Sequence, residues 1–129
     1  MTAAIFVLLV ALGLWWIFRF YPERRTVRQF LDTVVAGDFR KAHSMWRQSA
    51  SYAYEDFLQD WGPNGEYGPV HSYKIESIAK PDGGSGVVVV VELSQYQPFP
   101  DASDAAKSRR NKEARIWIES KDLSMSYAP

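Results

Sequence analysis

The sequence predicts an α+β protein: an apolar N-terminal helix followed by a small domain in which helices precede an antiparallel sheet. Three observations support this prediction. The stretch from Met1 to Phe18 has no charged residue and is almost wholly apolar. Between residues 27 and 61 the apolar residues recur with the spacing of a helix. From residue 70 onward they alternate as in a strand. Because the helices come first and the strands follow as a group, the α+β class is favoured over an alternating α/β fold.

Residues 1–21 are predicted to form a transmembrane helix. The hydrocarbon core of a bilayer is about 30 Å thick and needs roughly 20 apolar helical residues. The residues at and just after the C-terminal end of this stretch are aromatic or basic, as is typical of the headgroup level. We therefore expect a membrane interface made of Trp15, Trp16, Arg19, Tyr21, Arg24 and Arg25.

A cleaved signal peptide is the main alternative. Such a peptide has basic residues before its apolar part and small residues at its cleavage site. No Lys or Arg precedes Arg19, and bulky residues occupy positions 15–21, where cleavage would fall. The pattern therefore favours an uncleaved anchor. The chain has no Cys, which excludes a lipidated-cysteine anchor and disulfides.

The basic residues predict the orientation of this anchor. Arg19, Arg24, Arg25 and Arg28 follow the apolar stretch, and nothing basic precedes it. Under the positive-inside rule, this asymmetry places the C-terminal domain in the cytoplasm. We expect a single-pass protein of the cell inner membrane with a cytoplasmic domain, and a periplasmic domain is the alternative.

Residues 22–129 are expected to form one small α+β domain. Pro22 should end or kink the membrane helix, because proline lacks the backbone N–H and clashes with the preceding turn. A second helix follows, and one apolar stripe along it contains Val27, Phe30, Leu31, Val34 and Val35. Gly37 then supplies a left-handed stop, and Asp38 can cap the next helix.

Two shorter helices are predicted next. The first presents an apolar face made of Phe39, Ala42, Met45 and Trp46. Ser51 is expected to cap the second. The inward residues of that second helix are Tyr54, Phe57, Leu58 and Trp61.

Four strands are predicted after the glycine- and proline-rich stretch 62–69. Residues 70–76 begin the alternation of apolar and polar side chains, and residues 87–93 continue it after a turn. A long polar loop separates these strands from residues 114–119. A tight turn then leads to a short last strand at 123–127. The strands follow one another as an antiparallel meander.

Two stretches resemble the NTF2-like (cystatin-like, cone-shaped α+β) superfamily. They are Val-Val-Ala-Gly-Asp-Phe-Arg-Lys-Ala-His at residues 34–43 and Ile-Trp-Ile-Glu-Ser-Lys-Asp-Leu at residues 116–123. The likeness covers about Thr26 to Tyr127 and leaves the anchor outside. It implies a curved sheet wrapped around a long helix, often with dimerisation or partner binding on the sheet face. It says less of function, because one fold hosts unrelated activities.

The sequence predicts no catalytic, cofactor-binding or metal-binding residue. Some enzymes of the resembling superfamily place an Asp or His and a Tyr inside the cone. The residues of these types here are His43, His71, Asp56, Asp60, Tyr52, Tyr54, Tyr67 and Tyr73. Their spacing offers no pairing that would position a general acid or base. Two histidines without cysteine argue against a transition-metal site, and the glycines at 83–86 lack the lysine and helix of a phosphate loop.

The charge balance argues against nucleic acid as a partner. Lys and Arg number 15, and Asp and Glu also number 15, so no net field attracts a polyanion. We therefore expect no nucleic-acid partner.

The valine-rich strand indicates a protein-binding surface instead. Val88 and Val90 point to the opposite side from their odd-numbered neighbours, and Trp117 lies on the same side of the third strand. A strand that is apolar on both faces should be covered on both, and the helices cover only one. We predict a partner on Val88, Val90 and Trp117. The alternative is that the loop at 95–108 folds over them.

These predictions combine into a function. Ala4 and Ala11 lie about two helical turns apart and would allow close contact with another membrane helix. We predict a non-catalytic accessory or assembly subunit of a larger integral-membrane complex, for example an energy-transducing one, that acts by protein–protein contacts. Its partners would be the lipid bilayer and integral-membrane proteins, or a second copy of the chain. The alternative is a membrane-tethered small-ligand binder or cone-fold enzyme that uses a concavity near Tyr54, Trp61 and Tyr73.

Overall fold

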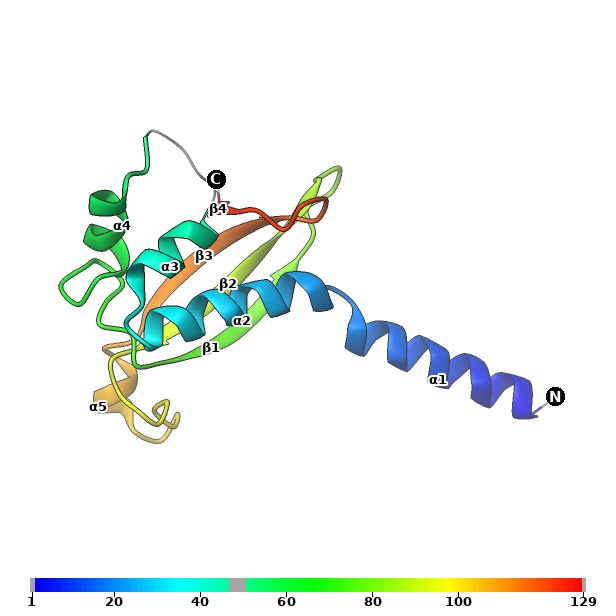
Figure 1. Cartoon of the computed structure of the whole chain (residues 1–129). Coiled ribbons are helices and arrows are strands. Elements are labelled where there is room, and N and C mark those ends of the chain that lie inside the picture. The colour runs from blue at the N-terminus through cyan, green and yellow to red at the C-terminus, as the bar shows by residue number, and fades with distance from the viewer. Residues whose placement is uncertain (1, 47–50, 129) are drawn as a thin grey trace.

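A computed structural model describes residues 2–46 and 51–128, and its helices and strands follow the predicted order (Figure 1). The elements are α1 (Thr2–Phe18), α2 (Tyr21–Val35), α3 (Phe39–Met45), α4 (Tyr54–Trp61), β1 (Ser72–Ala79), β2 (Gly86–Ser94), α5 (Ala105–Ser108), β3 (Lys112–Glu119) and β4 (Met125–Tyr127). The strands form one open antiparallel sheet in the order β1-β2-β3-β4. The predicted α+β class is confirmed.

The helix α1 extends away from the rest of the molecule (Figure 1). Among the described residues, the N-terminal helical stretch is the one that is long and apolar enough to cross a membrane. None of its most apolar window is buried against the domain. This length and composition fit a membrane span and also fit a signal sequence.

A short break at residues 19–20 separates α1 from α2. Phe20 has a φ of 60°, in the left-handed region that residues other than glycine rarely adopt. Pro22 was predicted to end or kink the membrane helix, but the break lies at residues 19–20. The physical reason is that proline is tolerated in the first turn of a helix, where its missing N–H has no intrahelical partner. Pro22 therefore starts α2 rather than ending α1.

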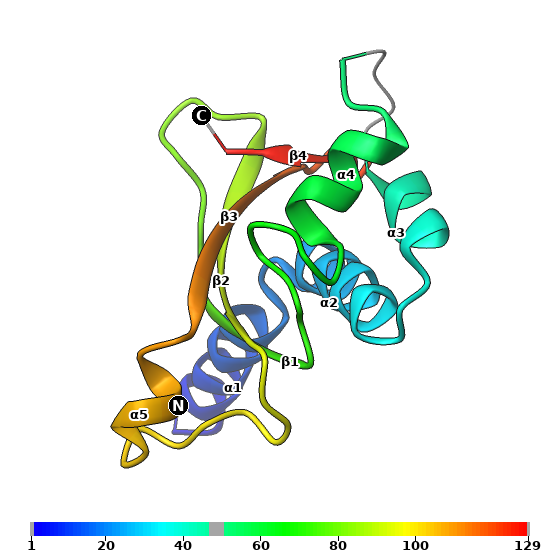
Figure 2. The same cartoon turned by 90° about the vertical axis from the view of Figure 1, so that its left-hand side faces the viewer.

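The helices α2, α3 and α4 all pack on one side of the sheet (Figure 2). The predicted stripe of α2 is confirmed: Val27, Phe30, Leu31 and Val34 are buried, and Val35 is half-buried. These residues meet the inward side chains of the sheet, which are Val87, Val89, Val91, Leu93, Ala114, Ile116, Ile118 and Met125. The core thus lies between α2 and the centre of the sheet.

A bulge in β1 changes which of its residues face the core. Ile75 pairs with Val91, but the register shifts before Ser77, so that Ile78 pairs with Val89. Because one extra residue is inserted, Ile75 and Ile78 both lie on the core side although they are three residues apart. Simple alternation of apolar and polar residues predicted that Ile75 faces the core, but it did not predict this for Ile78.

The corner between α2 and α3 forms as predicted. Gly37 has a φ of 82°, and the Asp38 carboxylate accepts a hydrogen bond of 3.3 Å from the backbone N–H of Lys41. Glycine is favoured at such a position because it has no Cβ to clash with the backbone.

Three predicted boundaries are wrong. Ser51 does not cap α4: the N-cap is Ala53, and its own N–H donates to Asp56 at 3.2 Å. Here a carboxylate inside the first turn takes up a free backbone donor, so no preceding Ser is needed. The first strand starts at Ser72 rather than at Val70. The last strand starts at Met125, because Leu123 adopts a left-handed φ of 59° in the tight turn.

Candidate functional site: a basic elbow and an uncovered sheet face

Basic side chains gather where α1 meets α2. We call Arg19, Arg24, Arg25, Arg28 and Lys80 the basic elbow. Four of them come from the end of α1 and the first half of α2. Lys80 follows β1, whose C-terminal end reaches the same place and shares a hollow with Arg19 and Arg24. The sequence predicted the arginines as a group and missed Lys80, because only the fold brings it there.

Arg19 is held among aromatic rings. Its guanidinium carbon lies 5.0 Å from the ring centroid of Trp15 and 5.3 Å from that of Trp16. The ring of Phe20 is nearer still, at 4.6 Å. Each such cation–π contact stabilises by about 0.5–1 kcal/mol at an exposed site. The predicted interface residues Trp15, Trp16 and Arg19 therefore form one cluster.

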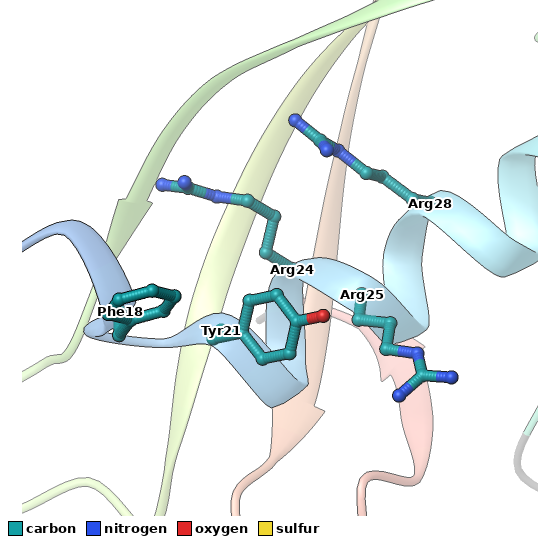
Figure 3. A pocket seen from close by; sticks show the side chains of 5 residues that line it. All are labelled: Phe18, Tyr21, Arg24, Arg25 and Arg28. Atoms are coloured by element: carbon teal, nitrogen blue, oxygen red, sulfur yellow. The ribbon is translucent and has the colours of Figure 1, made fainter.

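Three hollows surround the basic elbow. The first, of about 290 Å³, is lined by Phe18, Tyr21, Arg24, Arg25 and Arg28 (Figure 3). The second, of about 280 Å³, lies between the end of α1, Arg24 and residues 78–80. The third, of about 400 Å³, is bordered by the first turns of α2 and by Leu123. In Figure 3, Arg24 and Arg28 point to one side of α2, and Arg25 points to the other.

The charges of the basic elbow are not neutralised by the chain itself. Over residues 2–46 and 51–128, the ion pairs within 4.0 Å are Lys107–Asp104 and Arg115–Glu113, and neither involves the elbow. Arg28 also borders a hollow that contains Asp32, whose carboxylate accepts a hydrogen bond of 2.6 Å from the hydroxyl of Tyr73. The basic elbow thus presents positive charge on both sides of α2.

Glu23 is an acidic residue of this region that the sequence analysis missed. It is 7% exposed and lies on the buried side of α2, one turn before Val27. Its Oε2 atom has no hydrogen-bond partner among the described residues. The available signal was a charged residue four positions before the apolar stripe, where it faces the core. Glu23 faces the interior and makes no ion pair with the elbow.

The outer face of the sheet carries the three predicted partner-binding residues together. We use "outer face" for the side of the sheet opposite α2, where Val88, Val90 and Trp117 lie half-buried. Val88 is directly opposite Trp117, and Val90 is opposite Arg115. Figure 2 shows no described segment over this side. The loop before β3, with α5, lies at the end of the sheet, where Asn111 donates to Glu92 at 2.7 Å.

Trp117 is held by Glu119 of its own strand and by the start of β2. Its indole N–H donates to Glu119 Oε1 at 2.7 Å, and the hydroxyl of Ser85 donates to the same oxygen at 3.0 Å. A Cβ added at Gly86 would lie 2.9 Å from the Trp117 ring, so the ring rests on this glycine. Trp117 therefore stabilises the pairing of β2 with β3 and also contributes to the outer face. Val88 and Val90 contribute apolar surface to the outer face without making these supporting contacts.

One end of the outer face is acidic. Glu76, Glu92 and Glu113 line a hollow of about 280 Å³ together with Asn111 and Lys112. The hydrogen bond with Glu92 raises the pKa of Glu76, and the same bond lowers the pKa of Glu92. In the described part of the chain, no three His, Cys, Asp or Glu side chains are arranged so that they could hold a metal ion together.

Inside the fold, four side chains from distant segments form a polar network. The hydroxyls of Tyr52 and Tyr127 each lie 2.7 Å from Asp60 Oδ2, and Trp61 Nε1 donates to the Tyr127 hydroxyl at 2.9 Å. Burial raises the pKa of both tyrosines, so both stay protonated at neutral pH. Tyr52 and Asp60 were among the candidates whose pairing the sequence did not reveal. The hydroxyl of Tyr52 donates directly to Asp60, and Tyr127 of the last strand contacts both residues.

The other candidate residues have structural partners. His43 lies 3.0 Å from the carbonyl oxygen of Tyr52, and His71 lies 2.6 Å from that of Gln95. Tyr54 lies under the guanidinium of Arg40, which is 4.4 Å from its ring centroid.

The predicted concavity near Tyr54, Trp61 and Tyr73 is occupied by side chains at its centre. Trp61 is fully buried, and its ring centroid lies 5.0 Å from that of Phe30. It therefore offers no surface to a ligand.

The small residues predicted for contacts in the membrane lie on exposed α1. Ala4 and Ala11 are exposed and seven residues apart, which places them on the same side of the helix. This side of α1 is open to another helix.

Comparisons of the chain with protein-family models, with curated proteins and with solved structures find no match. Of the architecture that the NTF2-like resemblance implies, the structure shows the coarser part. This part is a long apolar helix, further helices and an open four-stranded antiparallel sheet. The functional argument rests on the basic elbow, the outer face and α1.

Proposed function

We propose that this chain is a single-span, membrane-anchored accessory or assembly subunit of a larger integral-membrane complex, and that it acts by protein–protein contacts. The observation that carries the proposal is the outer face. Helices cover one side of an apolar sheet, and the side with Val88 and Val90 has no cover from the described chain. Apolar sheet surface left in this way is typical of an interface.

The helix α1 supports the membrane part of the proposal. Its large apolar side chains are 45% to 68% exposed, and the domain shields none of its most apolar window. Exposure of apolar surface to water costs about 25 cal/mol per Å², so such a helix is stable only in lipid or against another protein. The aromatic cluster around Arg19 then lies at the membrane surface, as is typical of interfacial Trp and Arg.

The charges around the outer face indicate what kind of partner surface fits it. The apolar centre is bordered at one end by Glu76, Glu92 and Glu113. Arg115 lies opposite Val90 and Lys74 lies opposite Glu92, so both signs of charge border the apolar residues. A complementary partner therefore presents an apolar patch with charges of opposite sign placed beside each, because charges across an interface are arranged in opposite signs.

We also propose that the domain is a member of the NTF2-like superfamily. The Gly37–Asp38 corner and the meander of strands after the helices support this assignment. The alternative function, a small-ligand binder or enzyme in the cone, is less well supported. The aromatic side chains of Phe30, Trp46 and Trp61 fill the space between the helices and the sheet.

Purification of the tagged full chain from its native membranes in a mild detergent tests the proposed function. We expect integral-membrane proteins in stoichiometric amounts by mass spectrometry. Val90→Glu should release them, since it places a charge in the apolar centre of the outer face. Val90 is preferred to Trp117, whose loss would also disturb the hairpin.

Gln59→Glu is the matched control, because it introduces the same residue at an exposed position of α4 on the opposite side of the sheet. It should leave the partners bound. Purification without partners, or equal release by both variants, would contradict the proposal. So would a mature protein that lacks residues 1–20.

A further inference from the structure

The basic elbow brings together cations from three separate segments. Arg19 ends the α1 region, Arg24 lies in the first turns of α2, and Lys80 follows β1, and all three line one hollow of about 280 Å³. Arg24 also lines the adjoining hollow of about 290 Å³ with Arg25 and Arg28. Convergence of like charges is unfavourable without an anion between them.

Among the described residues no carboxylate forms an ion pair with the elbow, although Asp32 borders a separate hollow with Arg28. No carboxylate lies within 4.0 Å of these five side chains in the described ion pairs. Glu23, the nearest acidic residue in the sequence, is buried on the core side of α2. The N-terminal end of α2 adds partial positive charge from its free N–H groups. An anion from outside the chain is therefore favoured here.

The lining of the two hollows is apolar toward α1 and basic toward the domain. Trp16 and Phe18 come from α1, whereas the cations are Arg19 just after α1, the arginines of α2 and Lys80 after β1. A free phosphate ion would use only the basic part. A molecule with an anionic head and an apolar tail uses both parts, because its tail can lie along the exposed side chains of α1.

We propose that the basic elbow is a binding site for an anionic phospholipid, whose phosphate lies between Arg19, Arg24 and Lys80 and whose acyl chains lie along α1. The inference rests on the proposed membrane anchor. It adds a ligand class and a consequence for orientation. The end of the sheet that carries Ile78, Ala79 and Lys80 faces the membrane, and α4, at the other end of the helical layer, faces away (Figure 1).

Native mass spectrometry of the full chain in mild detergent tests this site. Phosphatidylglycerol and phosphatidylcholine with identical acyl chains are added in parallel. We expect phosphatidylglycerol to be retained on the order of tenfold more tightly, since each basic residue near the surface contributes to binding of anionic lipid. The double variant Arg24→Gln/Lys80→Gln should lose this preference.

Lys41→Gln/Arg110→Gln is the matched control, because it removes the same charge from exposed positions of α3 and of the loop before β3. It should keep the preference. The conservative variant Arg24→Lys retains the charge, and it should keep most of the preference even if the glutamine variant folds poorly. Circular dichroism checks the folding of each variant.

Equal retention of the two lipids by the wild type would overturn the site, and so would equal loss of preference in the control. Displacement of the lipid by millimolar glycerol phosphate would also overturn it, because a free phosphate would then be the ligand. The proposed function fails separately. If the chain prefers phosphatidylglycerol but purifies without protein partners, the lipid site stands and the accessory role fails. If it purifies with partners but shows no lipid preference, the accessory role stands and the lipid site fails.

Discussion

Glu23 places a carboxylate on the side of α2 that packs against the core. Its Oε2 atom has no hydrogen bond among the described residues, and the side chain is 7% exposed. A buried carboxyl oxygen without a partner loses its hydration and gains nothing in return, which costs about 1–3 kcal/mol. The domain thus gives up stability at the position next to the basic elbow.

Replacement of this carboxylate by an apolar side chain should stabilise the domain. For Glu23→Met we expect the free energy of unfolding to rise by about 1 kcal/mol, because an unbranched apolar side chain removes the unpaired charge and keeps the volume. Chemical denaturation of the full chain in detergent measures the change. Glu55→Met, at an exposed position of α4, should have little effect. A loss of stability in Glu23→Met would mean that the carboxylate is paired in solution.

Gly86 is required by its contacts rather than by its backbone angle. A Cβ at this position would collide with the carbonyl oxygen of Ile118 and would lie 2.9 Å from the Trp117 ring. For Gly86→Ala we expect a loss of about 2–3 kcal/mol, because neither the strand nor the indole can move away cheaply.

Gly37→Ala is the comparison for this variant. Its added Cβ meets nothing within 4 Å, but φ is 82°, so only the backbone strain of about 1 kcal/mol applies. Denaturation midpoints of the two variants should therefore differ in this order. The reverse order would show that the hairpin tolerates a side chain beneath Trp117.

At the scale of elements, the network around Asp60 ties the helical layer to the last strand. Tyr127 of β4 receives a hydrogen bond from Trp61 and donates to Asp60, both in α4. Tyr52, which precedes α4, contributes a hydroxyl 2.6 Å from that of Tyr127. Since β4 has only three residues, these contacts add to its short pairing with β3 in holding it to the fold.

The network predicts a loss of stability at alkaline pH. Burial raises the pKa of Tyr52 and Tyr127 above the value of about 10 for a free tyrosine. Above that pH the unfolded state releases protons that the folded state keeps, so the free energy of unfolding falls as pH rises. The stabilisation is fully present below pH of about 10.

Tyr127→Phe should make this alkaline decline shallower. At neutral pH the same variant should cost about 1–2 kcal/mol, because Trp61 and Asp60 lose a buried partner. Urea denaturation at several values between pH 8 and pH 11 measures both effects. Tyr54→Phe, outside the network, is the control and should follow the wild type. An unchanged slope in Tyr127→Phe would contradict the role of this hydroxyl.

Much of the architecture could be predicted because it depends on local periodicity. The stripe of α2, the Gly37–Asp38 corner and the strand alternation follow from spacing alone. The β1 bulge could not be predicted, since an inserted residue leaves no pattern in a half-polar strand. The α4 cap was wrong because Asp56 satisfies the backbone from within the helix.

The candidate site was predictable to a smaller extent. The arginines after α1 and the outward valines could be read from order and alternation. Lys80, Tyr127 and the underside of Trp117 depend on segments that meet only in the folded chain. Glu23 was visible in the sequence as a charge in line with an apolar stripe, but nothing nearby in the sequence indicated whether it would find a partner.

At the scale of the whole molecule, membrane attachment and partner binding are assigned to different parts of the chain. In the proposed function, the apolar α1 and the basic elbow hold the chain at a membrane, and the outer face contacts a membrane protein. The basic elbow includes Lys80, which follows the C-terminal end of β1, so the end of the sheet nearest α1 is basic. A short span and a small domain are then sufficient for an accessory role.

Site-specific photo-crosslinking in native membranes tests this central claim most directly. A photoreactive amino acid replaces Val90 in one full-length chain and Gln59 in another, and the adducts are identified by mass spectrometry. The account predicts a discrete adduct with an integral-membrane protein from position 90 and none from position 59. No adduct at position 90, the same adducts from both positions, or an adduct only with a second copy of the chain would contradict it.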